Sequence, residues 1–230
     1  MVVVPCRIIE GMNSRVLSAL ALLAALWVPA LAEQNLITNG SFEENELGFD
    51  GNWADYNIPT GTNSLQGWDV ISTVDLTGTA WQAEDGICSI DMAASRSIGE
   101  IAQTFATTPG ESYTVSFWWT DNPDYYKVDE SPIESMCVSA GGTTMNYTID
   151  ASKAGNSDSD MRYMNSQFMF TAGSSSSTLE FLSTEGSRYC GIVIDNVEVE
   201  AVPEPSSLIA LAPFAALVVV RRRRAVRRSG

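Results

Sequence analysis

The chain has 230 residues, a formal net charge of −15 and no histidine. The lack of histidine excludes Ser-His-Asp and Cys-His catalysis, so carboxylates are the only plausible groups for proton transfer. Between positions 33 and 200, five basic residues stand against 26 acidic ones, a formal charge of −21. A surface this acidic repels nucleic-acid phosphates, and it suits solubility outside the cell and capture of divalent cations.

The N-terminal segment predicts export. An apolar run at 16–28 follows a basic residue and precedes Ala30 and Ala32, which form an A-x-A site. This order is typical of a signal peptide that signal peptidase removes after Ala32. The run is too short to span roughly 30 Å of hydrocarbon comfortably. Residues 1–32 are therefore predicted to be a leader with an upstream extension, and Met12 begins its ordinary part.

Residues 33–200 are predicted to form one β domain. Short β-type segments alternate there with Gly, Asn, Asp, Ser and Pro, and none has helical periodicity over three turns. Strands are predicted near Leu36–Ser41, Gly67–Ser72, Gly86–Met92, Glu100–Ala106, Ser112–Thr120, Ser135–Ala140, Met145–Ile149, Tyr163–Thr171, Thr178–Leu182 and Gly191–Val199. This pattern predicts an all-β fold, an antiparallel β-sandwich of the jelly-roll type.

Two of the predicted strands have an informative spacing of apolar residues. One strand places four large side chains on a single face: Tyr113, Val115, Phe117 and Trp119. The last strand carries apolar residues whose spacing slips by one position, which predicts a bulge: Ile192, Ile194, Val197 and Val199. Long connections at 45–64 and 121–132 are expected to be functional or mobile.

Three cysteines remain after the leader is removed: Cys88, Cys137 and Cys190. An odd number in an exported protein predicts one disulfide and one buried free thiol, with all three pairings open. None has the close C-x-x-C spacing of a zinc or redox site.

The C-terminal segment, residues 201–230, has three parts in a fixed order. Pro203, Glu204 and Pro205 precede an apolar run at 206–220, and six arginines follow within 221–228. As a helix the run would be roughly 22 Å long, which is short for a membrane span, and the arginines would stay cytoplasmic. This order resembles the PEP-CTERM sorting signal of Gram-negative bacteria. The resemblance implies that an exosortase acts near Pro-Glu-Pro and that the β domain lies at the cell surface, in the outer envelope or in the extracellular matrix.

The body carries a second resemblance. Residues 39–44 (NGSFEE) open it and residues 194–199 (IDNVEV) close it, with GEIAQTF at 99–105 and TPGESYTVSF at 108–117 between them. From Leu36 to Val199 this succession resembles the choice-of-anchor C family, which implies a galactose-binding-like jelly roll.

The same resemblance suggests a metal site. Related carbohydrate-binding jelly rolls often hold a structural Ca²⁺ where the first and last strands meet, which implies Glu43 and Asp195 as ligands together with backbone carbonyls. The alternative is that these two carboxylates cap turns or accept backbone N–H bonds.

A sugar site would use an aromatic platform beside carboxylates and amides, because a sugar ring presents an apolar C–H face and hydroxyl groups. The candidates for that platform are Trp53, Tyr125 and Tyr126, the latter two in the acidic 121–132 connection. Trp68 and Trp81 lie next to predicted strands and are expected in the core. Trp118 and Trp119 are consecutive in a strand, so they face opposite ways.

These features predict an exported, non-catalytic protein that associates with exopolysaccharide. One alternative is an acidic matrix protein that adheres through Ca²⁺ without a specific sugar site. A glycosidase with paired carboxylates is the third possibility. It is less favoured because no segment places two acids between flanking aromatic residues.

Overall fold

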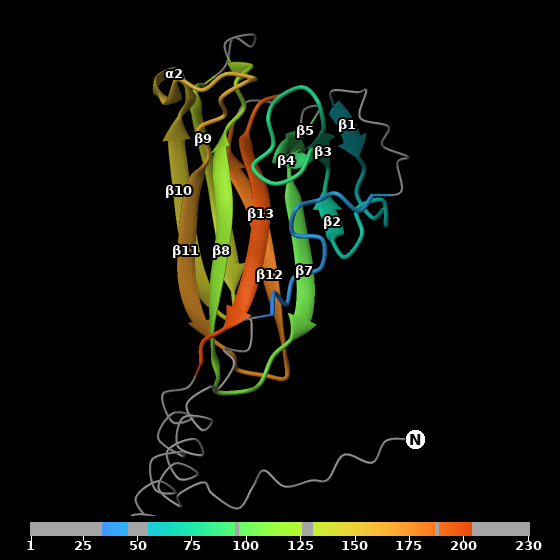
Figure 1. The fold of residues 1–230 in the computed structure, drawn as a ribbon, viewed down its shortest axis with the longest axis vertical. Coiled ribbons are helices and arrows are strands. Elements are labelled where there is room, and N and C mark those ends of the chain that lie inside the picture. The colour runs from blue at the N-terminus through green and yellow to red at the C-terminus, as the bar shows by residue number, and fades with distance from the viewer. Residues whose placement is uncertain (1–33, 46–54, 95–96, 126–130, 187–188, 204–230) are drawn as a thin grey trace, which may run out of the picture. The chain divides into compact units, whose positions relative to one another are not determined.

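Two antiparallel β-sheets lie face to face in the computed structural model, which describes residues 34–45, 55–94, 97–125, 131–186 and 189–203 (Figure 1). All the described residues belong to one compact unit of the chain. The long strands of both sheets run side by side, and the shorter strands β1 to β5 gather beside them (Figure 1).

The first sheet has six strands in the order β1-β3-β4-β13-β8-β11. Their bounds are β1 (Asp55–Ile58), β3 (Val74–Thr77), β4 (Ser89–Asp91), β13 (Ile192–Ala201), β8 (Ser112–Asp121) and β11 (Met164–Thr171). The last strand in sequence, β13, is therefore interior to the sheet, paired with β4 on one side and β8 on the other.

The second sheet has five strands in the order β10-β9-β12-β7-β2. Their bounds are β10 (Thr143–Asp150), β9 (Ile133–Ala140), β12 (Ser176–Glu185), β7 (Glu100–Ala106) and β2 (Asp69–Ser72). A small pair, β5 (Ala93–Ala94) and β6 (Ser97–Ile98), and the single-turn helix α2 (Ala151–Ala154) complete the described elements. The predicted all-β antiparallel jelly-roll sandwich is confirmed.

The core lies between the two sheets, and both predicted spacings are confirmed. The four large residues of β8 that share a face are all buried in it, and so are the four apolar residues of β13. The register of β13 against β8 shifts between Asp195 and Glu198, where Asn196 has a φ of 46°. The bulge restores the inward alternation after Asn196, which is why Ile194 and Val197 both face the core.

The predicted strand at Leu36–Ser41 is wrong. Asn39 and Phe42 have positive φ values of 55° and 61°, which a strand does not allow. The Asn39 side chain instead accepts from Glu44 N and donates to Glu44 O, and these bonds stabilise a turn. A Cβ atom at Gly40 would lie 2.0 Å from Val197 O, so the turn sits directly against β13.

The residues just before this turn still bond to β13. Leu36 N donates to Val199 O at 2.8 Å. Asn35 donates from Nδ2 to Val197 O at 3.2 Å and accepts from Val199 N at 3.0 Å. The start of the domain is thereby fastened to its last strand. The sequence analysis also missed the short strands β1, β3, β5 and β6, which are two to four residues long.

The predicted disulfide is wrong: Cys88, Cys137 and Cys190 are thiols that form no disulfide. The pairing of β4 with β13 would place Cys88 beside Asn196, six positions away from Cys190. Six residues of strand span about 20 Å, far beyond the roughly 7 Å between Cα atoms that a disulfide tolerates. Cys137 is on the outward-facing side of β9, away from the core that holds Cys88.

Within the described ranges, no helix is long and apolar enough to cross a membrane. The predicted leader, residues 1–32, and the apolar run at 206–220 lie outside those ranges.

Candidate functional site

Glu43 and Asp195, the two predicted calcium ligands, converge on the loop at 84–88. Glu43 Oε1 accepts from the backbone N–H groups of Ile87 and Cys88, both at 2.7 Å. Asp195 Oδ2 accepts from Glu84 N at 2.7 Å and from Asp85 N at 3.0 Å. Two residues 152 positions apart in the sequence thus hold the same loop.

The electrostatics of this site are set by burial and by N–H donors. Asp195 is fully buried and its Oδ1 also accepts from Asn196 N at 2.7 Å. Burial raises its pKa to about 7, and the backbone N–H bonds offset part of that rise. Burial and the neighbouring Glu43 carboxylate raise the pKa of Cys88 to about 12, so this thiol stays protonated.

N–H dipoles aimed at a carboxylate neutralise it locally, and the same dipoles repel a cation. No group of three or more acidic or cysteine side chains within the described ranges is arranged to hold a metal ion. The geometry at Glu43 and Asp195 favours the alternative role, acceptance of backbone hydrogen bonds. The calcium site stays a prediction.

The outward side of the five-stranded sheet presents polar side chains. By register and alternation, β10, β9, β12, β7 and β2 contribute the following residues, here called the polar face: Thr144, Asn146, Thr148, Ser135, Cys137, Ser139, Thr178, Glu180, Leu182, Glu100, Ala102, Thr104, Asp69 and Ser72. Most of these side chains are short and end in a hydroxyl, an amide or a carboxyl group. None is aromatic, so this surface lacks the predicted aromatic platform.

Two carboxylates meet near the middle of the polar face. Glu100 and Glu180 share a side-chain hydrogen bond, and partial desolvation together with Glu180 raises the pKa of Glu100. Ser139 Oγ donates to Glu180 Oε2 at 3.2 Å. A carboxyl pair flanked by hydroxyl groups offers both acceptors and a donor, which is the chemistry that binds sugar hydroxyls.

A group of buried acids lies at one end of the sandwich: Asp91, Asp121 and Glu134, each at most 2% exposed. Asp121 Oδ2 and Glu134 Oε2 have no hydrogen-bond partner. Burial, with the charges of Asp91 and Asp121, raises the pKa of Glu134 to about 9, and burial raises that of Asp121 to about 6. A protonated carboxyl is therefore the stable form of Glu134 at neutral pH.

The sequence analysis missed these acids, although it contained a signal for one of them. Asp121 continues the alternation that places Tyr113, Val115, Phe117 and Trp119 in the core, so its side chain faces inward.

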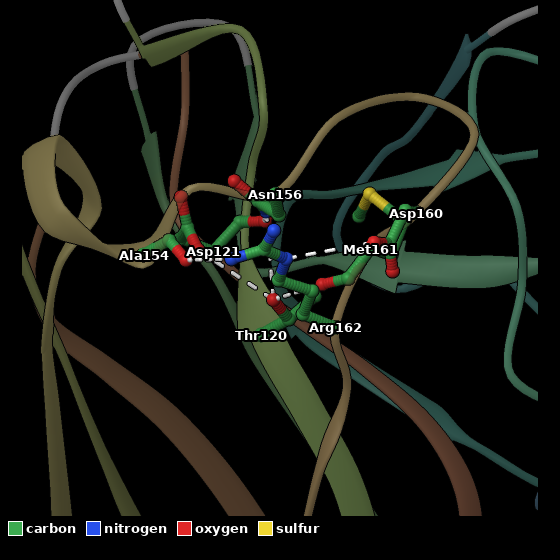
Figure 2. Close-up of polar contacts among 7 residues, drawn as sticks. All are labelled: Thr120, Asp121, Ala154, Asn156, Asp160, Met161 and Arg162. Carbon is green, nitrogen blue, oxygen red and sulfur yellow. Dashed lines mark hydrogen bonds and ion pairs between the residues drawn. The ribbon is translucent and has the colours of Figure 1, made fainter.

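The segment at 154–162 is tied to the end of β8 beside this acid group (Figure 2). Asn156 Nδ2 donates to Asp121 O at 2.8 Å, and Thr120 Oγ1 donates to Met161 O at 2.7 Å. Arg162 forms an ion pair with Asp160 at 3.5 Å and donates to Ala154 O at 3.3 Å (Figure 2). None of these contacts supplies a partner for Asp121 Oδ2.

The predicted aromatic and processing residues have different outcomes. Tyr125 is partly buried, and its backbone N–H donates to Asn122 O at 3.3 Å in a turn. Its place in an aromatic platform stays a prediction. Trp68 and Trp81 are 3% and 7% exposed, as expected of core residues. Pro203 follows β13 directly. The remaining predicted positions lie outside the described residues, namely Ala30, Ala32, Trp53, Tyr126, Glu204 and Pro205.

Comparison with solved structures finds carbohydrate-binding modules. The chain is similar to a family 4 module, with a TM-score of 0.42 and 16% identity, over 72% of this chain and 99% of that one. It is also similar to the family 61 module TmCBM61 with bound β-1,4-galactotriose, with a TM-score of 0.42 and 15% identity, over 74% and 99%.

Among sequences, the chain is 31% identical over 179 residues to halomucin of Haloquadratum walsbyi (strain DSM 16790 / HBSQ001). That match covers 75% of this chain and 2% of halomucin, so the chain corresponds to a small part of that protein. The pattern of one family, described as a protein of unknown function (DUF642), matches residues 35–200, which include both sheets of the sandwich. The chain therefore belongs to the DUF642 family.

Proposed function

We propose that this protein is a non-catalytic polysaccharide-associating protein of the cell surface or extracellular matrix. The observation that supports the proposal is the polar face, a sheet surface whose side chains are mainly hydroxyl, amide and carboxyl groups. Sugar hydroxyls bind such groups through several weak hydrogen bonds at once, and a polymer multiplies them along its length.

The polar face extends over all five strands of its sheet and presents hydroxyl groups at many positions. Its side chains are short, and neighbouring hydroxyl groups already form hydrogen bonds with one another. The oxygens of Thr104 and Thr178 are 2.8 Å apart, and those of Ser135 and Thr148 are 2.9 Å apart. A surface with neighbouring hydroxyl pairs suits a polymer that contacts many residues better than a small ligand that needs a deep pocket. Its carboxylates Asp69, Glu100 and Glu180 disfavour a polyanion.

Affinity electrophoresis of the full chain through gels that contain neutral polysaccharides tests the proposal. We expect slower migration in at least one gel, and a loss of about tenfold in affinity for the double variant Glu180→Ala with Asn146→Ala. Glu44→Gln removes an exposed acid outside the polar face, and the polysaccharide should slow it, relative to a gel without polysaccharide, as much as it slows the wild type. Unchanged migration of wild-type protein in every gel would reject polysaccharide association.

The proposal includes export and sorting. Signal peptidase would cut after Ala32, and an exosortase would act at Pro203, Glu204 and Pro205 to release or transfer the domain. The intact mass of the protein from the cell envelope, with and without the exosortase, tests both cuts in a single measurement. A mass equal to that of the uncut chain in both strains would reject both cuts, and a mass that lacks only residues 1–32 in both strains would reject the sorting cut alone.

The alternative is an adhesive matrix protein whose surface acids bind polymers through Ca²⁺. The charge of −21 between residues 33 and 200 favours it. Binding that follows Ca²⁺ and ionic strength without saturating would support this role, whereas saturable binding that a soluble oligosaccharide competes away supports a site on the polar face.

A further inference from the structure

Trp118 differs from the other three tryptophans of the described residues. Trp68, Trp81 and Trp119 are each at most 7% exposed. Each of these three donates its indole N–H to a protein oxygen, at 3.0, 3.0 and 2.9 Å respectively. Trp118 is partly exposed, and among the described residues its indole N–H has no acceptor and its ring has no aromatic partner. A large ring that is neither buried nor paired is available to a ligand.

The position of Trp118 in β8 places it on the outward side of the six-stranded sheet. Its neighbours Phe117 and Trp119 both face the core, so Trp118 faces away from it. In the register of β8 with β11 and β13, Asn165 pairs with Trp118, while Gln167 and Glu198 flank Ser116. These five residues form one patch, here called the Trp118 surface: Ser116, Trp118, Asn165, Gln167 and Glu198.

The Trp118 surface lies beside the part of the six-stranded sheet that the 84–88 loop covers. On the same outward side, Trp81 and Met161 pack over Val193 of β13. The next outward residue of β13, Asp195, pairs with Trp118 and is covered by the 84–88 loop. From Trp118 onward the outward side chains of β11 are exposed, and the side chains of Asn165 and Gln167 have no hydrogen bond within the described ranges.

We propose that the Trp118 surface is a second glycan-binding site, which takes an uncharged pyranose unit. The indole ring offers a face for the C–H groups of the sugar and an N–H donor at its edge. Asn165 and Gln167 each offer a donor and an acceptor, and Glu198, bonded to Ser116 Oγ at 3.5 Å, accepts from sugar hydroxyls.

The charges on this side of the sheet define the class of sugar. Glu198 and Glu200 are both on it. The basic residues in the described ranges, Lys153 and Arg162, are instead in helix α2 and in the segment shown in Figure 2. An anionic sugar at the outward positions of these strands would meet the carboxylates of Glu198 and Glu200, and like charge costs affinity.

This inference rests on the proposed polysaccharide association and adds a second contact to it. The two sheets lie face to face, so the polar face and the Trp118 surface point in opposite directions (Figure 1). One domain with a glycan site on each side can bridge two polymer chains, and the second contact strengthens attachment through effective concentration.

The test uses the full chain and two sets of variants in affinity electrophoresis against a panel of neutral polysaccharides. Trp118→Ala removes the ring, and Asn165→Ala with Gln167→Ala removes exposed amides without touching the core. Met169→Ala, at an exposed position of the same strand, is the matched control. We expect about a tenfold loss of affinity for Trp118→Ala and about a threefold loss for the amide pair, with the control unchanged.

The outcomes separate this inference from the proposed function. Wild-type affinity of both Trp118-surface variants, with a loss for Glu180→Ala and Asn146→Ala, would overturn the second site and leave the polar face standing. No binding by the wild type would overturn both. If Trp118→Ala fails to fold, the amide pair decides, since wild-type affinity there rejects the site and a loss supports it.

Discussion

Two buried acids of this domain, Asp195 and Glu134, differ in what surrounds their oxygens. Asp195 accepts three backbone N–H bonds, whereas Oε2 of Glu134 has no partner. Burial raises both pKa values, to about 7 for Asp195 and to about 9 for Glu134. Three N–H donors therefore recover part of the ionised form of Asp195 that burial disfavours, whereas Glu134, with one backbone N–H from Asn122 and one oxygen without a partner, keeps its proton. Asp195 fastens a loop, and Glu134 adds the larger pH dependence to stability because its pKa is raised further.

The largest expected effect is the pH dependence that Glu134 adds to stability. The pKa of Glu134 rises from an ordinary 4.5 to about 9 in the folded domain. The folded state thus holds a proton that the unfolded chain releases, and this contribution to stability is lost as pH rises from about 4.5 toward 9. This loss amounts to about 1.4 kcal/mol of unfolding free energy per pH unit. Between pH 5 and pH 8 the unfolding free energy of Glu134→Gln should therefore rise by about 4 kcal/mol relative to that of the wild type.

Urea unfolding at both pH values measures this difference. Glu44→Gln, which removes an exposed carboxylate, should follow the wild type across the same range. A Glu134→Gln variant that tracks the wild type at every pH would show that Glu134 is ionised or solvated in the folded protein. The comparison with Asp195 would then fail.

The next effect tests the other side of the comparison. Asp195→Ala would leave the N–H groups of Glu84, Asp85 and Asn196 without an acceptor, at a cost of about 3 kcal/mol. That is roughly a 10 °C lower melting temperature for a domain of this size. Asp195→Asn keeps one acceptor oxygen and should lose less. Calorimetry at pH 8 measures both, and an unchanged melting temperature for Asp195→Ala would contradict the role of Asp195 as a clamp.

A smaller effect is expected at Glu43, because this residue is largely exposed. Glu43→Ala removes the acceptor of Ile87 N and Cys88 N and should cost about 1 kcal/mol. Glu43→Gln, whose amide oxygen can still accept both bonds, is the matched control and should be nearly neutral. Thermal unfolding of both variants checks the difference, and equal losses would show that charge rather than the hydrogen bonds matters at this position.

The smallest effect concerns metal. Because N–H donors already neutralise Glu43 and Asp195, EDTA should shift the melting temperature by less than about 1 °C. A fall of several degrees that Ca²⁺ reverses would instead establish the calcium site predicted from the sequence. Titration of the EDTA-treated full chain with CaCl₂ in a calorimeter provides the measurement.

The fold was predictable because alternation depends on local sequence. The inward residues of β8 and the bulge in β13 follow directly from the spacing of apolar side chains. The turn at residues 39–42 was not predicted, since the apolar residues Leu36 and Ile37 just before it suggested a strand. Side-chain bonds from Asn39 and the contact of Gly40 with β13 decide its conformation, and the second of these depends on a partner far along the chain.

The site was predictable only in part. A resemblance brought Glu43 and Asp195 together, but it could not show that backbone N–H groups would occupy their oxygens. The register between strands places Asn165 and Gln167 beside Trp118 and Ser116, and a single sequence does not contain that register. Aromatic residues in loops were therefore favoured over one in a strand.

The place of β13 also determines how the domain bears tension. Any tether attached after Ala201 pulls along this strand, which is bonded to β4 and β8 on its two sides and to Asn35 and Leu36 at the start of the domain. A pull along an interior strand loads many hydrogen bonds together in shear instead of opening them one after another. A protein fixed by its C-terminal end while it holds polymer on its faces would thus transmit force through a strand that is hydrogen-bonded on both sides.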